Sequence, residues 1–303
     1  MSLTAIILIL ISAIMHAGWN LLSKSKLPTA AFFLISSFTG ALLLSPFLII
    51  NINIVTNHFS LNIWMLLLST GFFMSLYYVS LAGAYRSGEL SIVYPLARSS
   101  PAIVVSIVTL FFSQGNQISI LCIIGILFIV MGCFLIPVNK FSEIKIKNYL
   151  NLTCGLALLA AMGTAGYSII DDEALRQLRN NTNISINNIQ IAIIYACLQA
   201  WIAFIWLLFF VSFRRQGRLS FAKTFNEHLR YAMFAGVAIH ITYLLVLISF
   251  EYAKNVSYVV GFRQLSIPLG VLCGIVLLKE PSHKLKLIGV GIVFIGLILV
   301  ALG

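Results

Sequence analysis

Apolar residues occur along this chain in long, nearly uncharged runs that are separated by short polar segments. A transmembrane helix needs about 20 mostly apolar residues to cross roughly 30 Å of hydrocarbon. Runs of that length predict ten transmembrane helices, at residues 3–23, 29–50, 62–85, 89–112, 118–137, 149–170, 188–212, 230–252, 255–278 and 285–302. The longest segments between them, 171–187 and 213–229, are too short for a soluble domain. The pattern therefore predicts an all-α membrane protein.

The composition leads to the same fold class. Of the 303 residues, 60% are hydrophobic and only 9% are charged, whereas about a quarter of the residues in a soluble globular protein are charged. The composition excludes a water-soluble fold, so the lipid bilayer is the expected surrounding of the helices. We expect a multi-pass protein of the cell inner (plasma) membrane.

Basic residues are unevenly distributed between the connections. The chain carries 19 Lys and Arg against 8 Asp and Glu, a net charge of +11. The odd-numbered connections hold most of the basic residues, whereas the even ones hold only Arg176, Arg179 and Lys254. Because basic residues mark cytoplasmic loops, the odd connections are expected in the cytoplasm and both termini outside. The excess charge thus predicts topology and contact with anionic headgroups, and no nucleic-acid partner.

Parts of the chain resemble one another. The fifth run, IIGILFIVMGCFLI, and the tenth, LIGVGIVFIGLILV, align without a gap, so that Gly125 corresponds to Gly289 and Gly132 to Gly296. In the first and sixth runs, Gly-Trp-Asn at 18–20 corresponds to Gly-Tyr-Ser. Apolar helices also resemble one another through composition alone, and glycine is common in them. The equal glycine spacing at the corresponding run of each half favours a true duplication.

The duplication predicts two five-helix halves, 1–137 and 149–303. Because five is an odd number, the second half runs upside down relative to the first. An inverted repeat of this kind is typical of secondary transporters, which bind substrate near the membrane midplane between the halves.

Two arginines interrupt apolar runs. Arg98 lies ten residues past Gly88, roughly 15 Å into the membrane, and Arg263 lies eight residues past Asn255, roughly 12 Å from the opposite face. A charge at this depth costs at least about 2.5 to 3.5 kcal/mol and is tolerated where it faces a cavity or a partner. The guanidinium fork suits carboxylate and phosphate groups. The alternatives are hydrogen bonds to helix carbonyls freed by nearby prolines, or side chains that extend to the interface.

Aromatic and polar side chains gather on the runs expected to surround a cavity, and such groups suit a small-molecule pocket. With both arginines, the candidate substrate-binding residues are His16, Trp19, Asn20, Tyr77, Tyr78, Tyr94, Arg98, Tyr167, His240, Tyr243, Tyr258, Arg263 and Gln264. Several of them are expected only to pack.

Few titratable groups are expected deep in the membrane. His16 and His240 are candidates for a coupling proton, with a neutral imidazole in a helix contact as the alternative. Asp171, Asp172 and Glu173 follow the sixth run and are interpreted as boundary residues in contact with water. We therefore expect no acidic residue deep in any run. No cofactor, metal site or catalytic group is expected.

Three stretches resemble the EamA-like family of the drug/metabolite transporter superfamily: HAGWNLLSKS, YRSGELSIVYPLARSSP and LLKEPSHKLKLIGVGIVFIG. The resemblance covers nearly the whole chain. It implies a ten-helix secondary carrier whose cavity is built from runs one, three, four, six, eight and nine. Two features differ from the family: members usually keep both termini in the cytoplasm, and the first half has SQGNQ where the second has a Lys-Glu turn.

These observations predict a secondary active transporter of a small organic metabolite with a carboxylate, phosphate or phosphonate group, working by alternating access. A proton gradient or a counter-substrate would supply the energy, and the carrier would be a monomer or a homodimer. The alternatives are an exporter of neutral or zwitterionic amino acids or drugs, a membrane-embedded lipid-modifying enzyme, and a scaffold or receptor.

Overall fold

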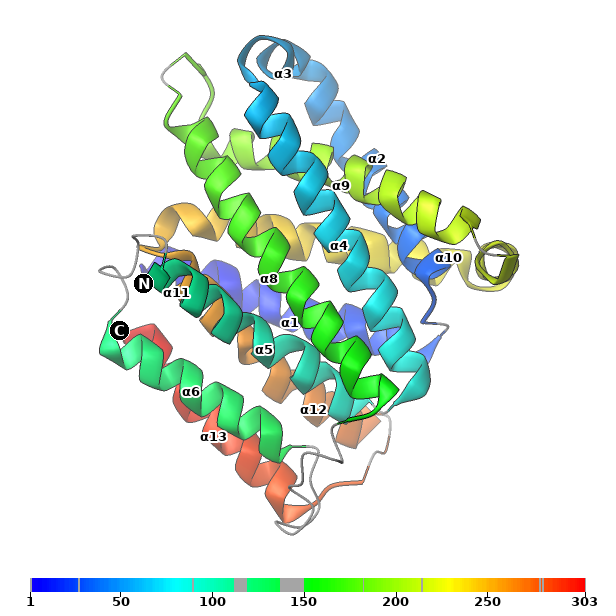
Figure 1. Cartoon of the computed structure of the whole chain (residues 1–303), viewed down its shortest axis with the longest axis vertical. Helices are drawn as coiled ribbons and strands as arrows, with labels where there is room; N and C mark the ends of the chain where they lie inside the picture. The colour runs from blue at the N-terminus through cyan, green and yellow to red at the C-terminus, as the bar shows by residue number, and fades with distance from the viewer. Residues whose placement is uncertain are drawn as a thin grey trace.

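The structure, a computed structural model, describes residues 2–26, 28–88, 90–111, 119–136, 150–181, 183–213, 215–277, 279 and 281–302. Every regular element in these ranges is a helix (Figure 1). The linker expected around 138–148 and the SQGNQ stretch lie outside the described residues.

The helices follow the predicted runs in chain order. The first half contains α1 (Leu3–Ser25), α2 (Ala30–Ile50), α3 (Ile52–His58), α4 (Leu61–Ser87), α5 (Leu90–Phe111) and α6 (Ile120–Leu135). The second half contains α8 (Leu152–Arg179), α9 (Asn188–Phe213), α10 (Arg215–Ser249), η3 (Phe250–Tyr252), α11 (Val256–Phe262), η4 (Arg263–Leu265), α12 (Ser266–Leu277) and α13 (Lys284–Leu302).

Eight segments of the described chain are long and apolar enough to cross a membrane, with α11, η4 and α12 together forming one of them. The apolar part of α5 and the whole of α6 are shorter. The structure therefore supports an all-helical multi-pass membrane protein, and ten spanning helices stay a prediction.

Two expected connections are largely helical. The helix α8 continues nine residues past the predicted run to Arg179, and α10 begins at Arg215 instead of residue 230. A search for apolar runs ends where polar residues begin, whereas Ala, Leu, Glu, Gln, Lys and Arg all favour a helix. The polar sequences DDEALRQLR and RQGRLSFAKTFNEHL consequently extend their helices. The short helix α3 was not predicted.

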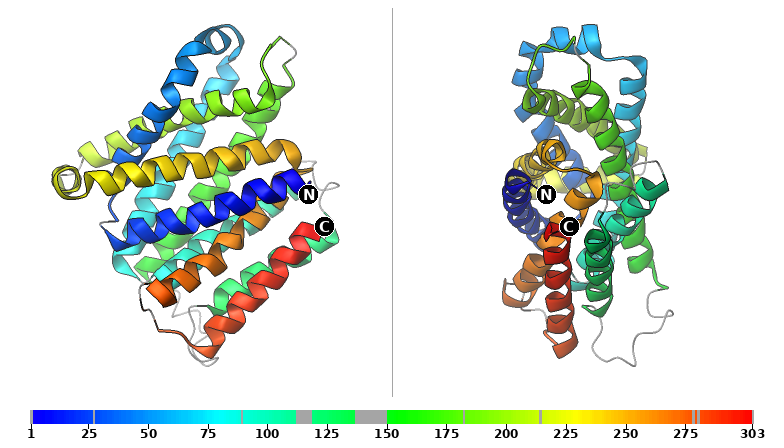
Figure 2. Two further views of the ribbon diagram at one scale, coloured as in Figure 1. Left: turned by 180° about the vertical axis from the view of Figure 1, so that it is seen from behind. Right: turned by 90° about the vertical axis from the view of Figure 1, so that its left-hand side faces the viewer.

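The helices form a bundle in which α6 and α13 pair at one end of the long axis, while α2 and α9 lie toward the other (Figure 1). Between them, α4 packs against α8, and α10 packs against α1. The first and last described residues lie at the same end of the spanning helices (Figure 2).

Glycines bring the backbones of α6 and α13 into contact. A Cβ atom on Gly125 would lie 2.6 Å from the carbonyl oxygen of Gly296, and one on Gly132 would lie 2.5 Å from that of Gly289. The sequence alignment pairs Gly125 with Gly289 and Gly132 with Gly296. In space the partners are exchanged: Gly125 contacts the counterpart of Gly132, and Gly132 contacts the counterpart of Gly125. Reciprocal exchange of this kind is the contact pattern of equivalent elements related by a two-fold axis.

Candidate functional site

The two arginines lie side by side in the interior of the bundle. Arg98 on α5 and Arg263 at the start of η4 are only 2% and 3% exposed. Arg98 Nη2 donates to the backbone oxygen of Arg263 at 3.4 Å and to Ser266 Oγ at 3.5 Å. Arg263 Nη2 donates to the hydroxyl of Tyr167 at 3.2 Å. Neither side chain extends to the surface. Arg98 bonds the backbone carbonyl of Arg263, which is not the carbonyl that Pro268 leaves without its amide partner.

Arg263 stands where the ninth predicted run changes from one helix to the next. The helix α11 ends at Phe262, one turn of 3-10 helix follows, and α12 begins at Ser266. Pro268 has no amide hydrogen, so the backbone carbonyl of Gln264 loses its usual partner and the helix is locally weakened. Broken helices near the midplane are frequent at the binding sites of transporters, because the freed backbone groups can line a cavity.

A small cavity adjoins both arginines. Of the candidate residues, the structure places His16, Trp19, Tyr77, Tyr78, Arg98, Tyr167, Tyr243 and Arg263 around it. Sequence reasoning did not select the other lining residues, Ser12, Ala13, Met74, Ile239, Thr242 and Val246. The lining comes from α1, α4, α5, α8, α10 and η4. These helices correspond to the six runs from which the family resemblance derives a cavity.

The cavity is nearly closed in this conformation. Its volume is about 20 Å³, which is enough for about one water molecule. A pocket that encloses an organic ligand usually measures roughly 300 to 1,000 Å³. An organic solute can enter only after the surrounding helices move apart.

The cavity is rich in hydrogen-bond donors. His16 Nδ1 accepts from Trp19 Nε1 at 3.1 Å, so the neutral imidazole carries its hydrogen on Nε2. That atom, Arg98 Nε and Nη1, and Arg263 Nη1 are buried and have no partner among the described residues. Buried donors without partners are costly, and the three residues that carry these donors line the same small cavity. No acidic residue is among the described side chains that line it.

Two of the other candidates are engaged in packing around the cavity. Asn20 donates to the backbone oxygen of His16 at 2.7 Å and accepts from Tyr85 OH at 2.7 Å. The ring of Tyr94 lies 6.2 Å from that of His16 and covers Gly270, where a Cβ would be 2.6 Å from the ring. Both side chains are buried outside the cavity lining.

Three further candidates lie apart from the cavity lining. The hydroxyl of Tyr258 accepts from the backbone amide of Ser119 at 3.0 Å, and Gln264 Nε2 donates to the backbone oxygen of Val260 at 2.7 Å. His240 packs over Gly40 of α2, where no Cβ would fit. In this conformation helix contacts engage these three side chains, so their contact with substrate stays a prediction.

Asp171 corrects the sequence interpretation. It is fully buried, although we expected a boundary residue. Its carboxyl group accepts hydrogen bonds from Thr70 Oγ1 at 2.6 Å, Tyr195 OH at 2.7 Å, Gln199 Nε2 at 2.7 Å and the hydroxyl of Tyr243. The reason is the continuation of α8, since eight more residues of helix follow Asp171 and the helices α4, α9 and α10 cover it.

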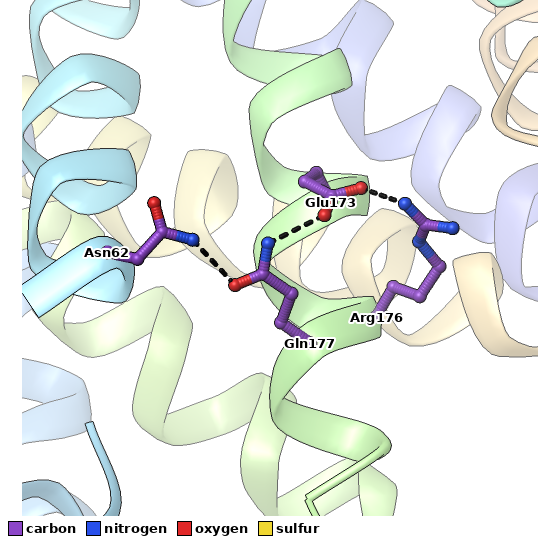
Figure 3. Close-up of polar contacts among 4 residues, drawn as sticks. All are labelled: Asn62, Glu173, Arg176 and Gln177. Atoms are coloured by element: carbon purple, nitrogen blue, oxygen red, sulfur yellow. Dashed lines mark hydrogen bonds and ion pairs between the residues drawn. The ribbon is translucent and has the colours of Figure 1, made fainter. Parts of the chain in front are cut away.

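The water-accessible end of α8 begins just beyond this point. Glu173 is partly exposed, forms an ion pair with Arg176 and accepts from Gln177 Nε2 at 2.6 Å. Gln177 in turn accepts from Asn62 Nδ2 of α4 at 2.8 Å, and Figure 3 shows these four side chains together. The surface carboxylate of Glu173 therefore lies only two positions along the same helix from the buried carboxylate of Asp171.

Tyr243 lies between Asp171 and the cavity. Its hydroxyl bonds Asp171, while its ring is 5.2 Å from that of Tyr167 in an edge-to-face arrangement. The guanidinium carbon of Arg263 is 5.7 Å from the ring centroid of Tyr243. One side chain thus connects the buried acid to the arginine cavity.

A larger groove lies between α2, α9 and α10. Its volume is about 580 Å³, and apart from Thr39 its described lining is apolar, including Phe38, Phe204, Phe221 and Phe225. A specific solute site needs several fixed polar groups. The groove lacks them and suits a lipid tail, so we take the arginine cavity as the candidate site.

Comparison with known proteins agrees with the resemblance noted above. The EamA-like transporter family matches residues 3–138, the first predicted half. This match confirms the resemblance over the first half, and the apolar helices indicate a multi-pass membrane protein.

Solved structures support the fold over the whole chain. Among 25 matching chains, one described only as the crystal structure of a protein has a TM-score of 0.65 at 13% identity. The alignment covers 99% of this chain and 95% of that one. At this identity the likeness concerns the fold alone. No curated protein matches.

Proposed function

We propose that this EamA-like membrane protein is a secondary active transporter of a small organic anion with a carboxylate, phosphate or phosphonate group. The observation that carries the proposal is the pair Arg98 and Arg263, buried side by side in a cavity whose described lining contains no acid.

The unpaired donors favour an anionic ligand. Two guanidinium groups repel each other, and each keeps at least one N–H group without a partner in the described structure. A carboxylate or phosphate oxygen accepts several charge-assisted hydrogen bonds at once. Binding an anion here would satisfy the donors and reduce the repulsion between the two arginines.

Several contacts support alternating access by inverted halves. The glycines of α6 and α13 exchange partners as a two-fold axis requires, and the packing of α4 on α8 repeats that of α10 on α1. In the proposed alignment, α4 corresponds to α10 and α8 to α1. Arg98 and Arg263 belong to the fourth run of each half, so each half would contribute one arginine to the substrate.

The closed cavity fits one step of such a cycle. A volume of about 20 Å³ leaves no room for a solute, so this conformation would be the closed one between two open states. Each open state would separate the helices of the cavity on one side of the membrane.

We propose an inner-membrane location with both termini outside. Basic residues near the end of α1, the end of α4 and the start of α13 lie opposite the termini, and such residues mark the cytoplasmic side. A monomer is favoured, because the glycine contacts of α6 and α13 are already made within one chain.

A neutral or zwitterionic amino acid or drug is the second candidate. The observation that favours it is the aromatic lining from Trp19, Tyr77, Tyr78, Tyr167 and Tyr243, since aromatic rings bind apolar and cationic groups. In that case the arginines would hold only the carboxylate of a zwitterion.

Ligand-dependent thermal stability of the purified full-length protein tests the proposal. Small carboxylates, phosphates and phosphonates are compared with their uncharged amides or esters. We expect stabilisation by at least one anion and by no matched neutral compound, with loss of the effect in Arg98→Gln and Arg263→Gln. Stabilisation by a neutral compound, retained in both variants, would contradict the anion proposal.

A further inference from the structure

We propose that Asp171 binds the proton whose movement is coupled to transport, and that this proton crosses the membrane in the same direction as the anion. The inference rests on the proposed function, which supplies the anion. Its starting point is that, among the acidic residues the structure describes, only Asp171 is fully buried.

The hydrogen bonds around Asp171 are compatible with both protonation states. The ionised carboxylate accepts from three hydroxyl groups, those of Thr70, Tyr195 and Tyr243, and from the amide of Gln199. A hydroxyl group is both a donor and an acceptor. If Asp171 gains a proton, one of the three hydroxyl groups can rotate so that its oxygen accepts a hydrogen bond from the protonated carboxyl group. No side chain then has to move away from Asp171. The site can therefore bind and release a proton without repacking.

The surroundings of Asp171 contain few other charges. The helix α9 presents Tyr195 and Gln199, α10 presents Tyr243, and α4 presents Thr70. On α8 itself, Asp172 follows and is partly exposed. Among the described residues, the cation seen against this group of side chains is Arg263, which faces the ring of Tyr243 from the cavity side. A change in the charge of Asp171 therefore acts most directly on Arg263, one of the two arginines that we propose to bind the substrate.

The corresponding position in the first half argues against a purely structural role. Aligning Gly-Trp-Asn at 18–20 with Gly-Tyr-Ser at 166–168 places Ser23 opposite Asp171. Ser23 is also fully buried. Since a hydroxyl is sufficient at this point of the first half, the helix packing does not by itself require a carboxyl group.

Electrostatics gives the direction of coupling. An ionised Asp171 and a bound anion are two like charges in a medium of low dielectric constant, so each weakens the other. Protonation of Asp171 removes that repulsion and leaves the arginines free to hold the anion. By thermodynamic reciprocity, the anion raises proton affinity by the same factor. Anion and proton therefore bind together and cross together.

Infrared difference spectroscopy of the full-length protein in lipid tests the proton site without any ligand. Acidification from about pH 8 to about pH 5.5, the range in which a coupling group must titrate, should produce a carboxylic C=O band. We expect Asp171→Asn to lose this band and Asp172→Asn, the neighbouring carboxylate on the same helix, to keep it. A band that survives in Asp171→Asn, or no band at all, would overturn the proposal.

Binding of lactate, a small carboxylate that stays ionised at both pH values, tests the coupling. The parent protein and Asp172→Asn should bind at least about 5-fold more tightly at the lower pH, the lower end of typical coupling factors. Asp171→Asn should bind equally at both. Equal binding by the parent at both values would overturn coupling, even if Asp171 titrates. A titrating Asp171 in a protein that binds no tested anion would instead overturn the proposed function and the coupling together.

A second variant covers the case in which Asp171→Asn does not fold. Tyr243→Phe retains the acid and removes one hydrogen bond to it, so the C=O band should persist at a shifted frequency. An unshifted band in a folded Tyr243→Phe protein would show that another carboxyl group titrates and would overturn the assignment.

Discussion

The hydroxyl of Tyr243 on α10 donates a hydrogen bond to the carboxyl group of Asp171 on α8. The aromatic ring of the same residue lines the arginine cavity. Tyr243 is therefore bonded to the acid at one end and lines the arginine cavity at the other. A protonation change at Asp171 can affect the cavity through it, and ligand binding in the cavity can affect Asp171. The first prediction concerns this contact.

Tyr243→Phe should weaken the pH dependence of anion binding while preserving binding at low pH within about 3-fold, because the ring remains and only the bond to Asp171 is lost. Loss of a hydrogen bond to a charged group should also lower the free energy of unfolding by about 1.5 to 3 kcal/mol. Calorimetric titration at several pH values measures the first effect and thermal unfolding the second. Tyr77→Phe, in the same cavity, should keep the parent's pH dependence. A Tyr243→Phe protein with an unchanged pH profile would contradict the role of this contact.

Lysine substitutions separate charge from geometry at the two arginines. Arg98→Lys and Arg263→Lys keep the positive charge but lose the planar fork, which lets a guanidinium bind a carboxylate or phosphate through two bonds. We expect each to weaken anion binding about 10-fold, which corresponds to about 1.4 kcal/mol, and each Gln variant to weaken it further. Titration calorimetry measures the affinities. Equal affinities for the Lys variants and the parent would show that charge alone is sufficient.

The two intramembrane histidines should behave differently. His16 lines the cavity and carries a buried Nε2 with no partner among the described residues, whereas His240 packs against α2. His16→Asn should weaken anion binding by about 2- to 10-fold, the effect of losing one ordinary hydrogen bond. His240→Asn should leave affinity within about 2-fold, although it can lower stability. The same titrations measure both variants, and a larger effect of His240→Asn would contradict the assignment.

The glycine contacts between α6 and α13 make a stability prediction. Gly132→Ala places a methyl group 2.5 Å from the carbonyl oxygen of Gly289, so the helices must separate at a cost of about 1 to 3 kcal/mol. Gly291→Ala on α13 is the matched control, since nothing lies within 4 Å of its added Cβ. That change should be neutral or stabilising by up to about 1 kcal/mol. Thermal unfolding in detergent compares them, and equal melting temperatures would contradict the close contact.

Sequence reasoning located the arginines because a charge within an apolar run is energetically conspicuous. Arg98 and Arg263 could be selected by depth alone, and the family resemblance supplied the helices around them. The structure then brought both residues to one cavity. Which tyrosines accompany them was less predictable, because a helix has several faces and the sequence does not show which one meets a neighbour. Tyr258 and Gln264 illustrate this, since both are buried in helix contacts.

Asp171 was misinterpreted for a definite physical reason. Hydropathy places the end of a helix at the first group of charges, but α8 continues through them and three other helices cover its inner side. A clue was present in the seventh predicted run. Tyr195 and Gln199 are polar residues four positions apart in an otherwise apolar sequence, so they share one face of a helix. Two such groups on one buried face require a polar partner on another helix.

The break at η4 gives the two arginines unequal freedom. Arg98 stands within a continuous helix, so its backbone moves together with α5, whereas Arg263 occupies a single short turn between two helices. A small rotation of that turn would redirect one guanidinium while the other stays in place. Under the proposed function, Arg98 would then hold the bound anion from a fixed backbone position, and Arg263 would hold it from a hinged one. Rotation of Arg263 away from the anion would be enough to begin substrate release.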